Sequence, residues 1–156
     1  MGVSSQYTKQ VNFNLSSLTE LSKQEPKFTR TGYTFSKWFD GVNRYDNEAL
    51  VNFNLDEVNL SAEWTINQYT VNWTIPTNGS IEVKAKGVAV ENGGKVEYQT
   101  VLTITATANP GYKLGTLKVN GVDFISGSEY TVGDANVTIS ASFDDNTGII
   151  TYWPCY

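Results

Sequence analysis

Apolar and polar residues alternate along most of this 156-residue chain, and this pattern constrains its fold more than any other feature. The clearest run would place these residues on one face of a strand: Tyr69, Val71, Trp73 and Ile75. Two later runs repeat the pattern, with Leu102, Ile104 and Ala106 in the first and Val137, Ile139, Ala141 and Phe143 in the second. Half-buried antiparallel sheets produce this signature. The sequence therefore predicts an all-β to β-rich α+β fold.

Turn signals separate these runs, at 76–79, 91–94, 109–111 and 120–121. Asn-Gly pairs supply the positive φ values that tight hairpins need, so 117–124 is predicted to be a hairpin with a two-residue loop. Helical spacing is found at 15–23, where three leucines recur every third residue before Pro26. That segment predicts one short helix.

Composition argues against several functions. The 16 acidic and 11 basic residues form no Lys/Arg stripe, so we expect no nucleic-acid partner. No long apolar run is present, and we expect no membrane insertion. The chain has no histidine and one cysteine, Cys155, which removes His-dependent triads, common zinc sites and an internal disulfide framework. We expect a protein that is not an enzyme and that holds no catalytic residues, metal or cofactor.

Two aromatic-rich segments, 32–40 and 60–64, are spaced as partner strands of one small β unit. Three of the four tryptophans, Trp38, Trp64 and Trp73, could form a platform for stacking sugars. Each lies in an alternating strand pattern, however, so we expect them in the structural core.

The order of motifs from about 11 to 64 resembles the Listeria-Bacteroides repeat, also called the internalin-type B repeat. The motifs are Val11-Asn12-Phe13-Asn14, Pro26, Gly32-Tyr33-Thr34-Phe35 with Trp38-Phe39-Asp40, and Leu60-Ser61-Ala62-Glu63-Trp64. The resemblance implies a β-grasp-like unit whose core contains Tyr33, Phe35, Trp38, Leu60 and Trp64. The sequence departs from the family at 16–21, where a Gly-rich turn is usual, and at Lys37, where Gly is usual.

From about 68 to 144 the chain resembles the divergent B-repeat of bacterial surface proteins, through segments 102–106, 110–114, 117–121 and 137–143. We therefore predict a β-grasp-like unit at 8–66, a small antiparallel β-sandwich-like unit at 67–144 and an aromatic tail at 145–156.

The tail is apolar, so it either packs back as an edge strand or docks onto another subunit. Its candidate protein–protein contact residues are Ile149, Ile150, Tyr152, Trp153 and Tyr156. Cys155 is expected to act as a small hydrophobe, with an intermolecular disulfide as the alternative.

The resemblance implies a non-catalytic structural or interaction protein, because such repeats serve as spacers, adhesin segments and interaction modules. Residues 1–6 lack the pattern of a secretory signal, which favours a bacteriophage virion, where the chain would be a capsid or tail decoration or assembly component. The alternative is a segment of a bacterial cell-surface adhesin or glycan-binding protein, with an extracellular location. Expected partners are other subunits of an assembly, with a host surface protein or glycan as a further option. A glycoside hydrolase is the third hypothesis, which paired carboxylates could support, although no constellation of residues stands out.

Overall fold

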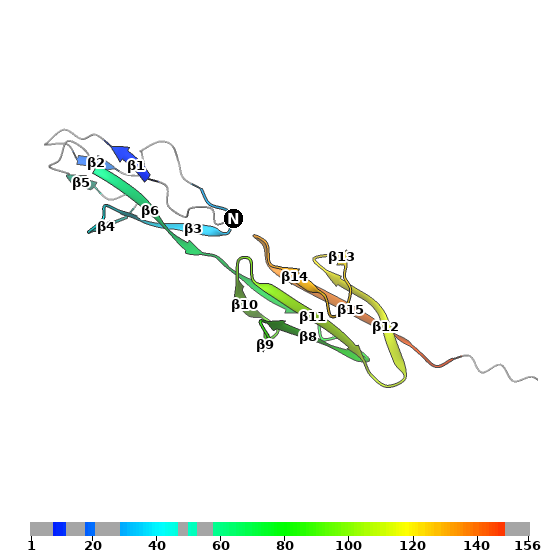
Figure 1. Ribbon diagram of the computed structural model, residues 1–156. Coiled ribbons are helices and arrows are strands. Elements are labelled where there is room, and N and C mark those ends of the chain that lie inside the picture. Colours follow the sequence, from blue (N-terminus) through cyan, green and yellow to red (C-terminus); the bar gives the residue numbers. More distant parts are fainter. Residues whose placement is uncertain (1–7, 12–17, 21–28, 47–49, 53–57, 149–156) are drawn as a thin grey trace, which may run out of the picture. The chain divides into compact units, whose positions relative to one another are not determined.

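The computed structural model describes residues 8–11, 18–20, 29–46, 50–52 and 58–148, with side chains described at 29–46 and 60–148. The chain divides into two compact units, Met1–Asn67 and Gln68–Tyr156 (Figure 1). Every regular element of the described residues is a β-strand. The fold is therefore all-β, which is one of the two fold classes that the sequence predicts.

The first unit contains a four-stranded antiparallel sheet and a separate strand pair. The sheet has the order β1 (Thr8–Val11), β6 (Val58–Ile66), β3 (Tyr33–Phe39) and β4 (Arg44–Tyr45). The pair is β2 (Leu18–Glu20) with β5 (Leu50–Asn52), also antiparallel.

The short helix predicted at 15–23 is wrong in its described part, because Leu18–Glu20 form strand β2. Three leucines span too few turns to offset the cost of nucleating a helix. Pairing with Leu50–Asn52 instead supplies backbone partners from a segment some thirty residues away in the chain.

A β-bulge in β3 decides which aromatic side chains share a face. Phe35 pairs with Trp64 and Lys37 with Glu63, so Ser36 is an extra residue opposite β6. After the bulge, Trp38 lies on the same face as Phe35, and the centroids of their rings are 5.0 Å apart. These two residues of β3 thus share a face although they are three positions apart, where two positions is usual.

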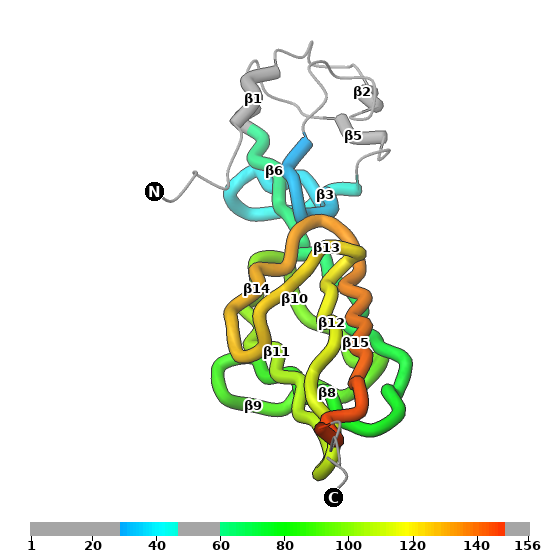
Figure 2. Tube along the Cα trace, turned by 90° about the vertical axis from the view of Figure 1, so that its right-hand side faces the viewer, coloured from blue at the N-terminus to red at the C-terminus, as the bar shows by residue number. Residues whose placement is uncertain are grey.

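The second unit consists of two sheets packed as a sandwich. The five-stranded sheet has the order β10 (Gly94–Glu97), β7 (Gln68–Trp73), β15 (Val137–Asp145), β12 (Tyr112–Val119) and β13 (Val122–Asp123). The four-stranded sheet has the order β14 (Glu129–Thr131), β11 (Val101–Ala108), β8 (Gly79–Ala85) and β9 (Val88–Ala89). Figure 2 shows this unit from another side, with β12 and β15 running next to each other.

The core of the second unit is formed by apolar residues of both sheets. Its buried members are Val71, Ile81, Val83, Val96, Leu102, Ile104, Leu117, Val119, Val132, Val137 and Ile139. The predicted faces of β11 and β15 are confirmed, since their alternate residues are buried or packed against this core. The prediction for Ile75 is wrong, because β7 ends at Trp73 and Ile75 is 80% exposed.

The hairpin predicted at 117–124 is confirmed. Val119 of β12 pairs with Val122 of β13, which leaves a two-residue loop. Asn120 has a φ of 49° and Gly121 a φ of 79°, as a type I′ turn requires.

The segment from β9 to β10 closes one edge of the sandwich. The amide of Val90 donates to a carbonyl of β8 and the amide of Gly93 to a carbonyl of β7, both at 2.8 Å. Between them, the side chain of Asn92 makes the two hydrogen bonds that the backbone of a neighbouring strand would make. Its Oδ1 accepts from the Trp73 amide at 2.8 Å and its Nδ2 donates to the Trp73 carbonyl at 2.6 Å.

The segment from β13 to β14 closes the other edge in the same way. The amide of Phe124 donates to a carbonyl of β12 at 2.9 Å, and that of Gly127 to a carbonyl of β11 at 2.8 Å. The Ser126 hydroxyl accepts from the Ala106 amide at 2.8 Å and donates to the Ala106 carbonyl at 3.2 Å. The four edge strands of the two sheets are short, with two residues each in β9 and β13, three in β14 and four in β10, so they offer little template for pairing with another chain.

Replacing Gly79 by alanine is expected to destabilise the second unit by about 1–3 kcal/mol, because a Cβ there would lie 2.3 Å from Cε2 of Phe143. Phe143 is buried in β15, so its ring must shift. Thermal denaturation of the Gly79→Ala variant should show a lowered midpoint. Adding Phe143→Leu to that variant should partly restore the midpoint. Gly133→Ala, where nothing lies within 4 Å of the added Cβ, is the matched control. Equal effects of the two glycine substitutions would contradict the packing of Gly79 on Phe143.

Candidate functional site

The first unit has an open pocket of about 400 Å³. It is lined by Thr29, Arg30, Thr31, Tyr33, Thr34, Phe35 and Trp64. These residues come from the start of β3, the turn before it and the facing part of β6. The volume falls at the lower end of the range for small-ligand sites, so a single sugar ring or one side chain is the right size.

Aromatic groups and one cation dominate the pocket lining. Cζ of Arg30 lies 3.5 Å from the centroid of the Tyr33 ring, in a cation–π contact. The rings of Phe35 and Trp64 meet edge to face, with centroids 5.9 Å apart. Nε1 of Trp64 is buried and has no hydrogen-bond partner among the residues that the structure describes. The lining thus combines flat apolar surface, threonine hydroxyls and a positive charge.

The residues predicted as core have different degrees of burial. Trp38 is 4% exposed and Leu60 is 2% exposed. Three others, Tyr33, Phe35 and Trp64, are partly buried and also line the pocket. Trp73 is partly buried against the core of the second unit.

The sequence did not single out Arg30 or the threonines of the pocket. One signal could have found Arg30, which is the first residue of the turn Arg30-Thr31-Gly32-Tyr33. Gly32 has a φ of 77°, and the Tyr33 amide donates to the Arg30 carbonyl at 3.1 Å. The turn therefore places Arg30 beside the first aromatic residue of β3.

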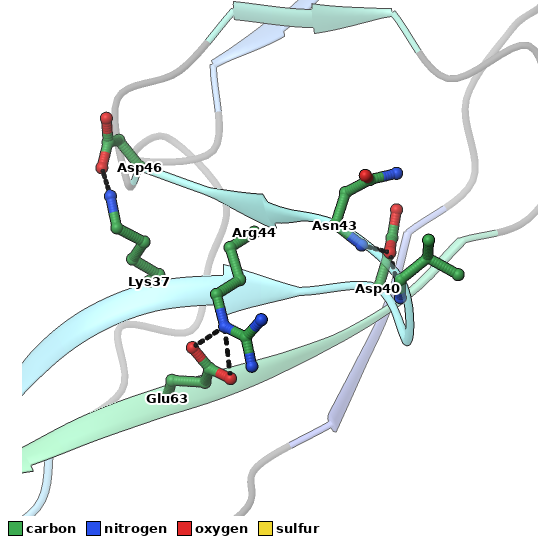
Figure 3. Close-up of polar contacts among 7 residues, drawn as sticks. Lys37, Asp40, Asn43, Arg44, Asp46 and Glu63 are labelled. Atoms are coloured by element: carbon green, nitrogen blue, oxygen red, sulfur yellow. Dashed lines mark hydrogen bonds and ion pairs between the residues drawn. The ribbon is translucent and has the colours of Figure 1, made fainter.

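A polar cluster covers part of the β3–β4 hairpin (Figure 3). Nε of Arg44 donates to both carboxylate oxygens of Glu63, at 2.8 and 3.0 Å, and its Cζ lies 4.7 Å from the Phe39 ring centroid. Lys37 pairs with Asp46. At least a third of each of these side chains is exposed to solvent, so each pair contributes little to stability. The carboxylates of Glu63 and Asp46 are therefore each held by a cation.

Asp40 organises the turn between β3 and β4. Its Oδ1 accepts from the amides of Val42 and Asn43 at 2.8 and 2.7 Å, and its Oδ2 accepts from the Tyr45 hydroxyl at 2.7 Å. Burial raises the pKa of Asp40, but these donors together outweigh it and hold the pKa below its ordinary value. Burial, followed by the hydrogen bond to Asp40, raises the pKa of Tyr45.

Asp40→Ala is expected to lower the free energy of unfolding of the first unit by about 1–2 kcal/mol, because three donors lose a charged acceptor. Tyr45→Phe, which removes one donor, should cost less. Since the folded-state pKa of Asp40 is lowered, its contribution is present above the ordinary value near 4 and is lost as the pH falls through the folded-state value. Urea denaturation at neutral and acidic pH measures both effects. An Asp40→Ala penalty that is the same at pH 7 and at pH 2 would contradict this role of the carboxylate.

The described residues contain no group of three or more His, Cys, Asp or Glu side chains that could hold a metal ion. Within the same residues, no helix is long and apolar enough to cross a membrane. The proposed contact residues of the tail, Ile149, Ile150, Tyr152, Trp153 and Tyr156, lie outside the described part of the chain, as does Cys155. Their roles stay predictions.

A family model described as the divergent InlB B-repeat domain matches residues 69–147, just over half of the chain. Comparisons with curated proteins and with solved structures returned no significant match. The matched range begins in β7 and ends just after β15, so it coincides with the sandwich. The resemblance of 11–64 to the Listeria-Bacteroides repeat lies outside this match and stays a prediction. The second resemblance is confirmed: the chain belongs to the divergent InlB B-repeat domain family, and its second unit is that domain.

Proposed function

We propose that this chain is a non-catalytic spacer and interaction protein carried on the outside of a particle or cell. Domains of the B-repeat kind are typically extracellular or surface-associated. The observation that carries the proposal is the parallel pairing of β7 with β15, the first and last strands of the second unit. Because parallel strands point the same way, the chain enters at one end of the sheet and leaves at the other. That arrangement suits a segment that holds two attachments apart.

The closed edges of the sandwich support the same role. A surface protein is displayed in many neighbouring copies, and an exposed strand edge would join them by backbone pairing. Asn92 and Ser126 each satisfy both backbone groups of a strand residue that the edge strand does not reach, Trp73 beyond the β10 pairing and Ala106 beyond the β14 pairing. We infer that this domain separates its neighbours and does not polymerise with them through its edges.

A bacteriophage virion is the carrier that we propose first, with a bacterial cell surface as the alternative. Mass spectrometry of purified particles and of peptides shaved from intact cells distinguishes the two. The virion proposal predicts a fixed copy number per particle and labelling of intact particles by antibodies against the chain. Recovery in the cell-surface fraction alone would favour the adhesin, and recovery only from the interior of cells would contradict both.

The absence of histidine from the sequence supports a non-catalytic role, as does the lack of a metal-binding cluster among the described residues. A panel of glycoside hydrolase and esterase substrates tests it directly. We expect no turnover above the buffer rate at micromolar concentrations of the protein. Turnover that persists through repeated purification would contradict the proposal.

Glycan binding at the pocket of the first unit is the second candidate function. The Arg30–Tyr33 stack and the rings of Phe35 and Trp64 offer a flat surface with a cation beside it, which suits a sugar that carries a carboxylate. A glycan array would test it, with Arg30→Ala expected to weaken binding by roughly tenfold or more because a charged hydrogen bond is lost. Lys37→Ala, outside the pocket, is the matched control. Binding that survives Arg30→Ala would exclude this pocket, and an array without acidic glycans among its hits would exclude this ligand.

A further inference from the structure

The two terminal strands of the second unit lie next to each other inside the five-stranded sheet. β7 has β10 on one side and β15 on the other, while β15 lies between β7 and β12. The parallel register pairs Val137 with Val71 and Ile139 with Trp73. Neither terminal strand is at an edge of the sheet, so neither can leave it without breaking contacts on both sides.

The register places the ends of the unit far apart along the strand axis. Gln68 begins β7 three residues before the partner of Val137, and Asp145 ends β15 eight residues beyond Val137. At about 3.3 Å per residue, the two ends are separated by roughly 36 Å along the strands. Tension at these ends pulls β7 toward its first residue and β15 toward its last, so the two strands are driven to slide past each other.

We propose that the second unit is a mechanical clamp, in which the β7–β15 pair resists tension along the chain in shear. Sliding loads all hydrogen bonds between the two strands at once. Peeling an antiparallel hairpin from its open end breaks them one after another. The same number of hydrogen bonds therefore resists a larger force when the strands slide than when they peel apart. This inference deepens the proposed spacer role and rests on it.

Side chains reinforce both sides of the clamp. The Thr70 amide of β7 donates to Oδ1 of Asn136 at 2.9 Å, which extends the bonding between the terminal strands by one residue. On the far side of β15, the Thr138 amide donates to Oδ1 of Asn120 at 2.7 Å and the Asn120 amide donates to the Thr138 carbonyl at 2.8 Å.

Buried packing and a second side-chain bond resist the same sliding. Val71 and Val137 are each 0% exposed, so relative movement of the strands would also disrupt the core. Asn92 holds Trp73 at the end of β7 through two hydrogen bonds. The clamp therefore combines backbone, side-chain and apolar contacts.

Single-molecule force spectroscopy on the full chain tests the clamp, with Cys155→Ser and pulling handles at introduced cysteines. Handles at Gln68→Cys and Gly148→Cys apply shear to β7 and β15. Handles at Thr77→Cys and Asn109→Cys instead peel β8 from β11, because Gly79 pairs with Ala108 at that end of the two strands. We expect a rupture force roughly twofold or more higher in the shear geometry at the same loading rate, since several bonds must break together.

A variant separates the clamp from general stability. Asn136→Ala should shorten the lifetime under constant force roughly fivefold in the shear geometry, as expected for one lost hydrogen bond, and should leave the peeling geometry unchanged. Asn136→Asp, which keeps an acceptor oxygen, should preserve the lifetime. Equal rupture forces in the two geometries would overturn the clamp, as would equal effects of Asn136→Ala in both. The spacer role would survive that result, because the particle and cell-surface experiments test it separately.

Discussion

Replacing Ile104 by alanine is expected to lower the free energy of unfolding of the second unit by about 2–5 kcal/mol. Ile104 is 0% exposed in β11, where it pairs with Val83 of β8 and belongs to the core shared by both sheets. Its carbonyl also accepts from the Gly127 amide at 2.8 Å, so the closing segment is packed against the same position. The substitution leaves a cavity that the two sheets cannot collapse to fill without moving relative to each other.

Urea denaturation followed by hydrogen-exchange mass spectrometry can measure this loss, because peptides from the two units are read separately. Val101→Ala is the matched control, since Val101 lies in the same strand and is 41% exposed. We expect its cost to stay below about 1 kcal/mol. A similar cost at both positions would show that β11 does not present alternate residues to a core.

Trp38→Ala is expected to lower the free energy of unfolding of the first unit by about 3–5 kcal/mol. Trp38 is 4% exposed, contacts the Phe35 ring and is paired with Ala62 across β6. Among the side chains of the first unit that the structure describes, at 29–46 and 60–67, Trp38 is the largest buried hydrophobic one, so its removal leaves a large cavity. The same mass-spectrometric readout applies, with the transition of the second unit as an internal reference.

Phe39→Ala tests the β-bulge in β3 at the same time. Phe39 is the next residue in the strand, is only partly buried and contacts Arg44 on the opposite face. Its removal should cost clearly less than removal of Trp38. If the two substitutions lower the free energy of unfolding equally, Trp38 does not lie on the buried face. The β-bulge would then not be at Ser36.

The parts of the fold that follow from local sequence were predicted well. The alternation at 137–143 needs no knowledge of partners, because a period of two already fixes which residues share a face. The loop at Asn120 and Gly121 is also local, since both residues tolerate positive φ. The same short stretches of sequence would be expected to produce these features in any β fold.

The features that were missed depend on partners distant in the chain. Ser36 becomes a bulge residue only because of how β6 is aligned with β3. The segment Leu18–Glu20 becomes a strand because Leu50–Asn52 pairs with it. The parallel direction of β7 and β15 is invisible to periodicity, because half-buried strands show the same alternation in either direction.

The candidate site was predicted only in part. Tyr33, Phe35 and Trp64 were selected as core residues, and the same three residues line the pocket. A strand pattern indicates which face a side chain occupies but not whether that face is fully covered. Arg30 escaped notice because it lies before the strand, in a turn whose geometry brings it over Tyr33.

The distance between the two ends of the second unit is the most direct test of the claim that this domain is a spacer. Spin labels at Gln68→Cys and Asn146→Cys, with Cys155→Ser, allow pulsed electron paramagnetic resonance to measure it on the full chain. The parallel pairing of β7 and β15 predicts a narrow distribution centred at roughly 40 Å, twelve strand residues of about 3.3 Å each. A distribution centred near 10 Å, as expected for ends that meet on the same side of a sheet, would contradict the account.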